Sequence, residues 1–139
     1  HLSGADDFNR VAQNYKNYKV KAATFSFLDK MGLAYAASDL IVSRSGATTL
    51  AEICAGGKPS ILVPYPFARG HQKFNALALE DRGAAIVIEQ KNLDAVVLKD
   101  NIISLLNDHK RLESMSTNSR NLSNLNGAEN LAQEVISLC

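Results

Sequence analysis

The segment from Leu40 to Gly57 constrains the fold of this chain more than any other part of it. It opens with the apolar run Leu40-Ile41-Val42, passes through small and hydroxyl residues, and continues as a helical pattern that ends at Gly56-Gly57. A short, uninterrupted apolar run is typical of a parallel strand that is covered on both faces, and glycine often ends a helix. The segment therefore predicts a buried strand, a tight turn and a helix.

The turn within this segment has the features of an anion site. Gly46 and Ala47 leave the backbone uncovered, so the free N–H groups of the helix start can approach an anion, and the helix dipole favours negative charge there. The hydroxyls of Ser45 and Thr48 can donate to phosphate oxygens. Glu52 follows about one helical turn later, where a carboxylate can accept hydrogen bonds from the two hydroxyls of a ribose. The pattern predicts a nucleoside-diphosphate site.

A purely structural interpretation of the same residues stays open at this point. Thr49-Leu50-Ala51-Glu52 fits a capping box, in which the threonine oxygen and the glutamate carboxylate satisfy the first helix amides. Ser45 and Thr48 can likewise cap the helix. Arg44 can neutralise a phosphate, or it can pair with a carboxylate beside the strand end.

Strand and helix patterns alternate along the chain. Strands are predicted at 18–27, 40–42, 60–63 and 84–88, and helices at 7–17, 29–37, 47–55, 70–81, 92–106, 110–121 and 128–138. This alternation predicts an α/β fold, a Rossmann-like parallel sheet flanked by helices, with right-handed crossovers. We predict one domain over residues 1–139, with a helical tail from about residue 92. The chain opens on His1-Leu2-Ser3-Gly4 without a preceding strand, so we expect it to be N-terminally incomplete.

Three polar loops are predicted to meet at one edge of this sheet. In open parallel sheets ligands bind at the carboxyl ends of the strands, and the loops at those ends are Phe27-Leu28-Asp29, Ser43 to Thr49, and Pro64 to Gln72. Such convergence favours a ligand site over a purely structural rim.

The helix predicted to begin near residue 70 offers side chains suited to a sugar. His71, Gln72 and Asn75 can each donate and accept hydrogen bonds, and His71 and Asn75 lie one turn apart on the same face. The alternative is that these are solvated residues of a helix start.

Composition excludes several classes of partner and chemistry. The 15 Lys and Arg residues nearly balance the 14 Asp and Glu residues, so no nucleic-acid partner is indicated. Cys54 and Cys139 fit neither a metal-ligand spacing nor a disulfide framework, and no apolar run is long enough to span a membrane. The sequence contains no Gly-x-Ser-x-Gly elbow and no Gly-Lys-Ser/Thr of a P-loop.

Longer stretches of the chain carry a family resemblance. The stretches 34–52 and 57–66 are followed by His71-Gln72-x-x-Asn75-Ala76 and Gly83-Ala84-Ala85, and the chain opens on His1-x-Ser3-Gly4. In order and spacing these resemble the MurG-type UDP-N-acetylglucosamine transferases of bacterial peptidoglycan synthesis, over essentially the whole chain.

The resemblance implies a GT-B glycosyltransferase, in which two Rossmann-like domains face a cleft and this chain is most of the C-terminal, donor-binding one. It implies transfer of N-acetylglucosamine from UDP-N-acetylglucosamine to lipid I, with inversion and release of UDP, to form lipid II. Such an enzyme serves cell-wall biogenesis, cell shape and cell division as a peripheral protein on the cytoplasmic face of the inner membrane. The alternative is a UDP-sugar-binding subunit of a split glycosyltransferase that needs a separate acceptor-binding chain.

The resemblance also implies roles for particular residues. Leu28 would hold the uracil through its backbone, and Glu52 would hold the ribose hydroxyls. Contacts to the diphosphate and sugar would come from Ala47, Thr48 and Thr49. The hydroxyls of N-acetylglucosamine would be recognised by His71 and Gln72, supported by Asn75.

Two parts of the family pattern lie outside this sequence. One is a Gly-Gly-Ser-x-Gly turn that also contacts the diphosphate; the other is the N-terminal domain, which the resemblance implies binds lipid I, faces the membrane and holds any general base. We therefore expect this segment alone to be inactive, with its catalytic residues unknown. The sequence has no Asp-x-Asp metal motif, and no metal or cofactor is expected. Stabilisation of the departing diphosphate is expected from the helix N-terminus.

Overall fold

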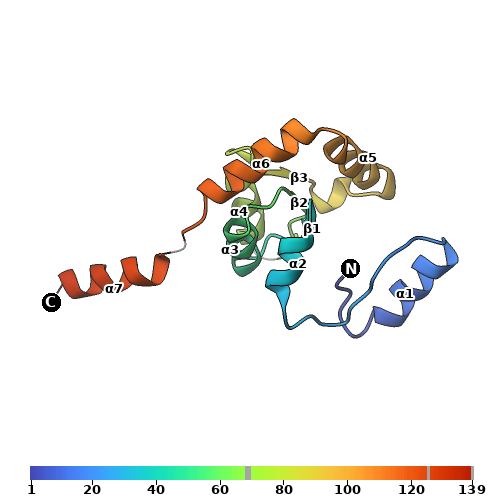
Figure 1. Ribbon diagram of the computed structural model, residues 1–139, viewed down its shortest axis with the longest axis horizontal. Helices are drawn as coiled ribbons and strands as arrows, with labels where there is room; N and C mark the ends of the chain where they lie inside the picture. The colour runs from blue at the N-terminus through green and yellow to red at the C-terminus, as the bar shows by residue number, and fades with distance from the viewer. Residues whose placement is uncertain (68–69, 125, 139) are drawn as a thin grey trace. The chain divides into compact units, whose positions relative to one another are not determined.

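The computed structural model describes residues 1–67, 70–124 and 126–138. The elements in chain order are α1 (Phe8–Asn17), α2 (Met31–Ala37), β1 (Ile41–Ser43), α3 (Ala47–Ala55), β2 (Ser60–Leu62), α4 (His71–Glu80), β3 (Ala85–Val87), the 3-10 helix η1 (Gln90–Asn92), α5 (Ala95–Leu106), α6 (His109–Asn121) and α7 (Gly127–Ser137) (Figure 1). The chain divides into two compact units, His1–Ala34 and Tyr35–Cys139. Each unit is described by itself.

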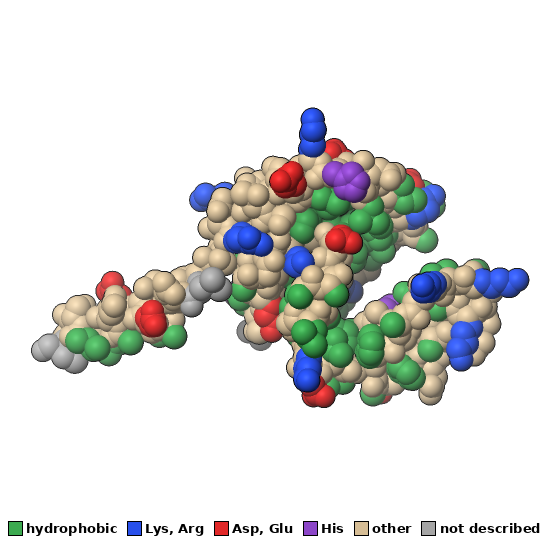
Figure 2. Space-filling model, viewed as in Figure 1, with side chains coloured by type: hydrophobic (Ala, Val, Ile, Leu, Met, Phe, Trp, Pro, Cys, Tyr) green, Lys and Arg blue, Asp and Glu red, His purple; other side chains and the backbone are tan. Residues whose placement is uncertain are grey.

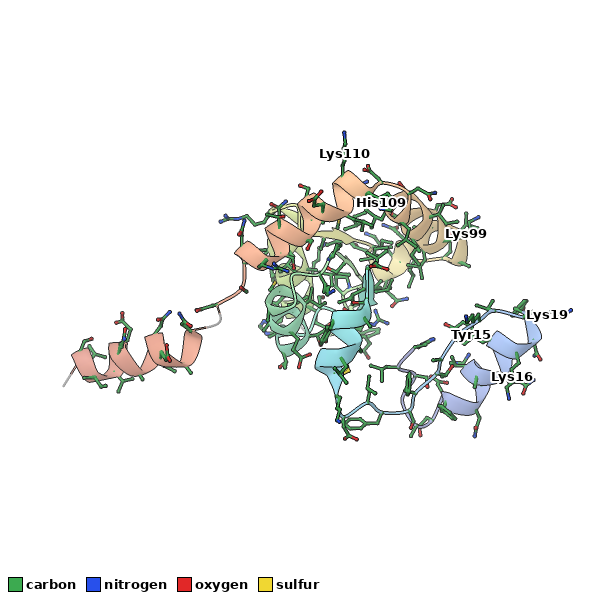
Figure 3. The ribbon with its side chains drawn as sticks, viewed as in Figure 1. Tyr15, Lys16, Lys19, Lys99, His109 and Lys110 are labelled. Atoms are coloured by element: carbon green, nitrogen blue, oxygen red, sulfur yellow. The ribbon has the colours of Figure 1, made fainter. Side chains whose placement is uncertain are left out.

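The first unit is built around α1. The predicted helix is confirmed, and Asp7 at its N-cap position pairs with Arg10 at 2.8 Å. Tyr15, labelled in Figure 3, projects from α1, and its hydroxyl lies 2.9 Å from Nδ1 of His1. These contacts hold the opening residues of the chain beside the helix.

The strand predicted at 18–27 is wrong for the part of the chain that the structure describes. Only Phe25 pairs there, in an isolated parallel bridge with Leu2, and Tyr18 is 80% exposed. A strand needs a neighbour that offers backbone partners along its length. The short segment around Leu2 offers them only to Ala23 and Phe25, through His1 and Ser3.

The second unit contains a parallel sheet in the order β1-β2-β3. Ile41 lies opposite Ser60, and Ser60 lies opposite Ala85 in the next pair. All of β2 is buried, as expected for a central parallel strand, whereas Val42 in β1 is 44% exposed. The predicted parallel sheet flanked by helices is confirmed.

The helices of this unit pack against the sheet and against one another. α4 contacts β3, and α6 contacts both α3 and α5. The hydrophobic core consists of the buried side chains Ile61, Val63, Ile88, Leu105 and Met115. Sheet and tail helices therefore share one core.

Capping residues set the helix starts in the tail. The Asp94 carboxylate accepts a hydrogen bond from the backbone N–H of Val97 at the start of α5, and that of Asp108 accepts one from Arg111 at the start of α6. His109 and Lys110 follow this second cap and point outward, as does Lys99 on α5 (Figure 3).

The last helix, α7, is amphipathic. Its hydrophobic side chains gather on one side of the helix (Figure 2), and Leu131 and Ile136 are 67% and 73% exposed. Among the described residues, no helix combines the length and apolar character that crossing a membrane requires.

Candidate functional site

The start of α3 presents backbone donors without partners. Gly46 occupies the N-cap position with extended backbone angles, and its carbonyl accepts the first intrahelical bond, from Leu50, at 3.0 Å. Within the described residues, no group accepts a hydrogen bond from the backbone N–H groups of Ala47, Thr48 or Thr49. Three amides without acceptors and the positive end of the helix dipole thus lie together at the helix start, which is the arrangement that binds phosphate groups.

The two faces of α3 differ sharply. Leu50, Ile53 and Cys54 are buried, and burial raises the pKa of the Cys54 thiol. The opposite face is exposed and carries Thr48 and Glu52 four residues apart, hence one above the other. The amide cluster and the Glu52 carboxylate therefore lie along one exposed strip of the same helix.

The capping-box interpretation of Thr49 and Glu52 is wrong. A capping box needs Thr49 at the N-cap, yet that position belongs to Gly46, three residues earlier. The Glu52 carboxylate instead accepts a 2.8 Å hydrogen bond from the hydroxyl of Tyr35 in α2. Burial, together with this bond, raises the pKa of Tyr35 to about 12.

Ser45 fastens the turn before α3 to the start of α4. Its side chain is fully buried, and its hydroxyl donates to the backbone carbonyl of Gln72 at 2.7 Å. Nδ2 of Asn75 donates to the carbonyl of Ser45 at 3.4 Å. These bonds favour a supporting role for Ser45 and Asn75 over direct contact of the Ser45 hydroxyl with phosphate.

The loop between β2 and α4 is held from two sides. Nη1 of Arg44 donates to the carbonyls of Val63 at 3.1 Å and Pro64 at 3.4 Å, and its guanidinium lies 5.6 Å from the Tyr65 ring centroid. Of the two roles considered for Arg44, these bonds favour the structural one, with backbone carbonyls in place of a carboxylate. The backbone N–H of Tyr65 donates to Oε1 of Gln72 at 3.0 Å.

Gln72 and His71 differ in which side-chain atoms are available for hydrogen bonds to a ligand. Because Oε1 of Gln72 is occupied, its Nε2 is the end that has no partner among the described residues, so Gln72 is available as a donor. His71 is the first residue of α4 and is exposed, after Gly70 with a φ of +80°. Such a φ favours glycine, and it turns the chain into the helix.

Leu28 belongs to the first unit. It is half-buried and lies shortly before α2 begins at Met31. Its expected backbone contact to uracil stays a prediction.

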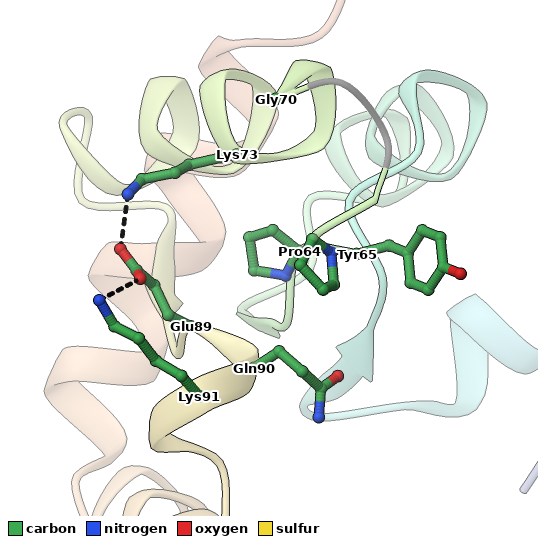
Figure 4. A pocket seen from close by; sticks show the side chains of 8 residues that line it. Pro64, Tyr65, Gly70, Lys73, Glu89, Gln90 and Lys91 are labelled. Atoms are coloured by element: carbon green, nitrogen blue, oxygen red, sulfur yellow. Dashed lines mark hydrogen bonds and ion pairs between the residues drawn. The ribbon is translucent and has the colours of Figure 1, made fainter.

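A pocket of about 220 Å³ opens beside the start of α4, at the carboxyl ends of β2 and β3 (Figure 4). Pro64 and Tyr65 form one wall, and Lys73 and Lys91 both approach Glu89, at 2.6 and 3.1 Å. The hydrogen bond from Lys73, followed by that from Lys91, lowers the pKa of the Glu89 carboxyl. The Lys73–Glu89 ion pair joins the first turn of α4 to the segment after β3, and the Lys91–Glu89 pair lies within that segment.

Sequence reasoning missed Tyr35 and the Lys73–Glu89–Lys91 cluster. Tyr35 is the single aromatic side chain in Ala34-Tyr35-Ala36-Ala37. This pattern indicates that the ring is buried, but it does not indicate which side chain the Tyr35 hydroxyl bonds to. Among the described residues no group of three or more His, Cys, Asp or Glu side chains is arranged to hold a metal ion.

Comparisons with known proteins fit this geometry. The model of the glycosyltransferase family 28 C-terminal domain matches residues 1–135. A curated relative from Chlorobium limicola, named UDP-N-acetylglucosamine–N-acetylmuramyl-(pentapeptide) pyrophosphoryl-undecaprenol N-acetylglucosamine transferase, is 40% identical over 98% of this chain. A relative of the same name from Halothermothrix orenii is 43% identical over 88% of the chain. The chain spans 37% and 35% of the length of these two relatives.

Solved structures agree with the sequence relatives. MurG from Acinetobacter baumannii superimposes with a TM-score of 0.89 at 26% identity, covering 99% of this chain and 42% of that one. The glycosyltransferase VinC shares the fold, with a TM-score of 0.65 at 18% identity over 89% of this chain and 32% of its own. This chain therefore belongs to the glycosyltransferase family 28 C-terminal domain family.

Proposed function

We propose that this chain is the donor-binding part of a glycosyltransferase that moves N-acetylglucosamine from UDP-N-acetylglucosamine to lipid I, forming lipid II and releasing UDP. The observation that carries the proposal is the start of α3, where the amides of Ala47, Thr48 and Thr49 have no acceptor among the described residues and Glu52 follows on the exposed face of the same helix. The name shared by the curated relatives supports the identity of donor and acceptor.

The geometry of α3 suits a nucleoside diphosphate. In the proposal the diphosphate lies on the free amides, and the ribose lies over the exposed face, where Glu52 accepts from its hydroxyls. One helical turn rises about 5.4 Å, so Glu52 follows the amide cluster by roughly the length that separates a diphosphate from a ribose.

The sugar lies at the start of α4 in this proposal. Ser45 and Asn75 fasten that helix start to the turn before α3, so donors for the diphosphate and for the sugar stay in register. Nε2 of Gln72 donates to a sugar hydroxyl, and the exposed imidazole of His71 can donate or accept. Glu52, His71 and Gln72 together would distinguish the donor.

In this proposal the start of α3 contributes to the chemistry by stabilising the leaving group. As the glycosidic bond breaks, negative charge grows on the diphosphate, and preorganised amides at a helix start stabilise that charge without reorienting. We place the acceptor, the general base and the contact with the membrane in another part of the protein. The acceptor of the named relatives carries undecaprenol, so we propose a peripheral position on the cytoplasmic face of the inner membrane.

The test replaces Glu52 in the full-length protein. Glu52→Ala is expected to weaken UDP-N-acetylglucosamine binding by about 1–3 kcal/mol, because the hydrogen bonds from the ribose hydroxyls to the carboxylate are lost. Isothermal titration calorimetry measures the change. Glu113→Ala makes the same charge change at an exposed position on α6 and should leave the affinity unaltered. Equal affinities of Glu52→Ala and the parent would remove Glu52 from the site.

A transfer assay on the same full-length protein separates the two candidate assemblies. Formation of lipid II by that single polypeptide is the expected result. Transfer that appears only after a separately encoded acceptor-binding chain is added would instead indicate a split glycosyltransferase.

A further inference from the structure

Tyr35 is a nearly buried phenol that no step above uses. Its side chain is 9% exposed, and its hydroxyl donates to Oε2 of Glu52 at 2.8 Å, although Glu52 itself lies on an exposed helix face. The bond joins α2 to α3 across 17 positions of sequence. A buried donor that reaches out to a solvent-facing carboxylate restricts where that carboxylate can point.

The backbone around Tyr35 is itself anchored. The hydroxyl of Ser38 donates to the carbonyl of Tyr35 at 2.8 Å. Nζ of Lys58, just after α3, donates to the carbonyls of Ala36 at 3.2 Å and Ser38 at 2.9 Å. The last turn of α2 is thereby tied to the turn between α3 and β2, and the Tyr35 hydroxyl is a donor with a fixed position.

We propose that Tyr35 is the positioning residue that orients Glu52 toward the two hydroxyls of the nucleotide ribose. The inference rests on the proposed function, in which Glu52 accepts those hydrogen bonds. Tyr35 does not touch the ligand; it acts through the carboxylate.

The acceptor capacity of Glu52 fits this role. A carboxylate has about four lone-pair sites on two oxygens, and the phenol occupies one of them on Oε2. Oε1 has no partner among the described residues, so one ribose hydroxyl can bond to each oxygen. Because the phenol is neutral, it orients the carboxylate without pairing its charge. Prior orientation of a flexible side chain lowers the entropy lost on binding.

The experiment compares Tyr35→Phe, Glu52→Ala and the double variant in the full-length protein. Each is titrated calorimetrically with UDP and with 2′,3′-dideoxyuridine diphosphate, which lacks both ribose hydroxyls. Tyr35→Phe keeps the ring in its packing and removes only the hydroxyl. Thermal melts establish that each variant is folded at the titration temperature, and Tyr18→Phe, at an exposed phenol in the other unit, is the matched control.

We expect Tyr35→Phe to weaken UDP binding by about 3- to 10-fold, the value of one hydrogen bond, and to leave the dideoxy ligand unaffected. In the Glu52→Ala background the same change should have no further effect. Lys58→Met, which loosens the anchored turn while keeping the phenol, should reduce the preference for UDP in the same direction. A preference for UDP over the dideoxy ligand that Tyr35→Phe leaves unchanged, whether affinity for both falls equally or not at all, would overturn the role of Tyr35.

The outcome also separates this inference from the proposed function. If Glu52→Ala leaves the preference for UDP over the dideoxy ligand intact, the ribose contact itself fails. If Glu52→Ala abolishes that preference but Tyr35→Phe preserves it, the ribose contact stands and the positioning role fails.

Discussion

The hydroxyl of Ser45 donates a 2.7 Å hydrogen bond to the backbone carbonyl of Gln72, joining the turn before α3 to the first turn of α4. Ser45 is fully buried, and Asn75 returns a bond to the Ser45 carbonyl. The two helix starts in the proposed donor site are therefore fixed to each other by the Ser45 and Asn75 side chains.

The contribution of this bond to stability can be measured by replacing each of two buried serines with alanine. Ser45→Ala removes this bond to the Gln72 carbonyl and should lower the free energy of unfolding by about 0.5–1.5 kcal/mol. Ser60 in β2 is equally buried, but its hydroxyl has no partner among the described residues. Ser60→Ala removes an unpaired polar group and should be neutral or stabilising. Urea denaturation measures both, and similar losses would show that the Ser45 bond carries no special weight.

The raised pKa of Tyr35 predicts how the free energy of unfolding changes at alkaline pH. Its pKa is raised from 10.0 to about 12, chiefly by burial and then by Glu52, so the folded state holds the phenol proton more tightly than the unfolded chain does. The resulting stabilisation is complete below about pH 10 and is lost as the pH rises from 10 toward 12. Tyrosinate absorbance near 295 nm, with Tyr35→Phe subtracted, reports this titration. Glu52→Gln should lower the pKa of Tyr35 but keep it above its ordinary value, because burial is the larger cause; a return to that value would contradict this order.

The sequence predicted those helices and strands whose start and end are set by residues nearby in the chain. The apolar run at Leu40, the glycines after α3 and the prolines after β2 mark β1, α3 and β2 within a few residues. The strand predicted at 18–27 was wrong because pairing depends on a partner, and Leu2 supplies only one bridge.

The candidate site was predictable to the same extent. A strand followed by small residues and a helix indicates free amides, and the structure has them at Ala47. The capping box was equally compatible with the sequence, since Thr49 and Glu52 have the right spacing; only the helix start at Gly46 decides against it. The partner of Glu52 could not be predicted from sequence, because Tyr35 lies 17 positions away and meets it only in the folded structure.

Gly57, at the end of α3, should not tolerate a side chain. Its φ is +58°, and an added Cβ would lie 2.7 Å from Nε of Arg120. Gly57→Ala should therefore lower the free energy of unfolding by about 1–2 kcal/mol, chiefly because of the left-handed backbone, since the end of the Arg120 side chain can shift at small cost. Gly32 in α2 is the control, because its Cβ would meet nothing within 4 Å, and Gly32→Ala should be stabilising by about 0.5–1 kcal/mol. Thermal denaturation that ranks the two substitutions in the reverse order would contradict this assignment.

A negative charge at the start of α3 should separate stability from binding. Ala47 is exposed at the first position of the helix, where an aspartate interacts favourably with the dipole, so Ala47→Asp should raise the free energy of unfolding by about 0.3–1 kcal/mol. The same carboxylate would occupy the free amides and repel a diphosphate, so UDP binding should fall to the limit of detection by calorimetry. Ala55→Asp introduces an identical charge at the other end of α3, where the dipole opposes it; this variant should lose stability and retain UDP affinity. Undiminished binding by a folded Ala47→Asp protein would mean that the phosphates lie elsewhere, because a fixed anion and a diphosphate cannot share three amides.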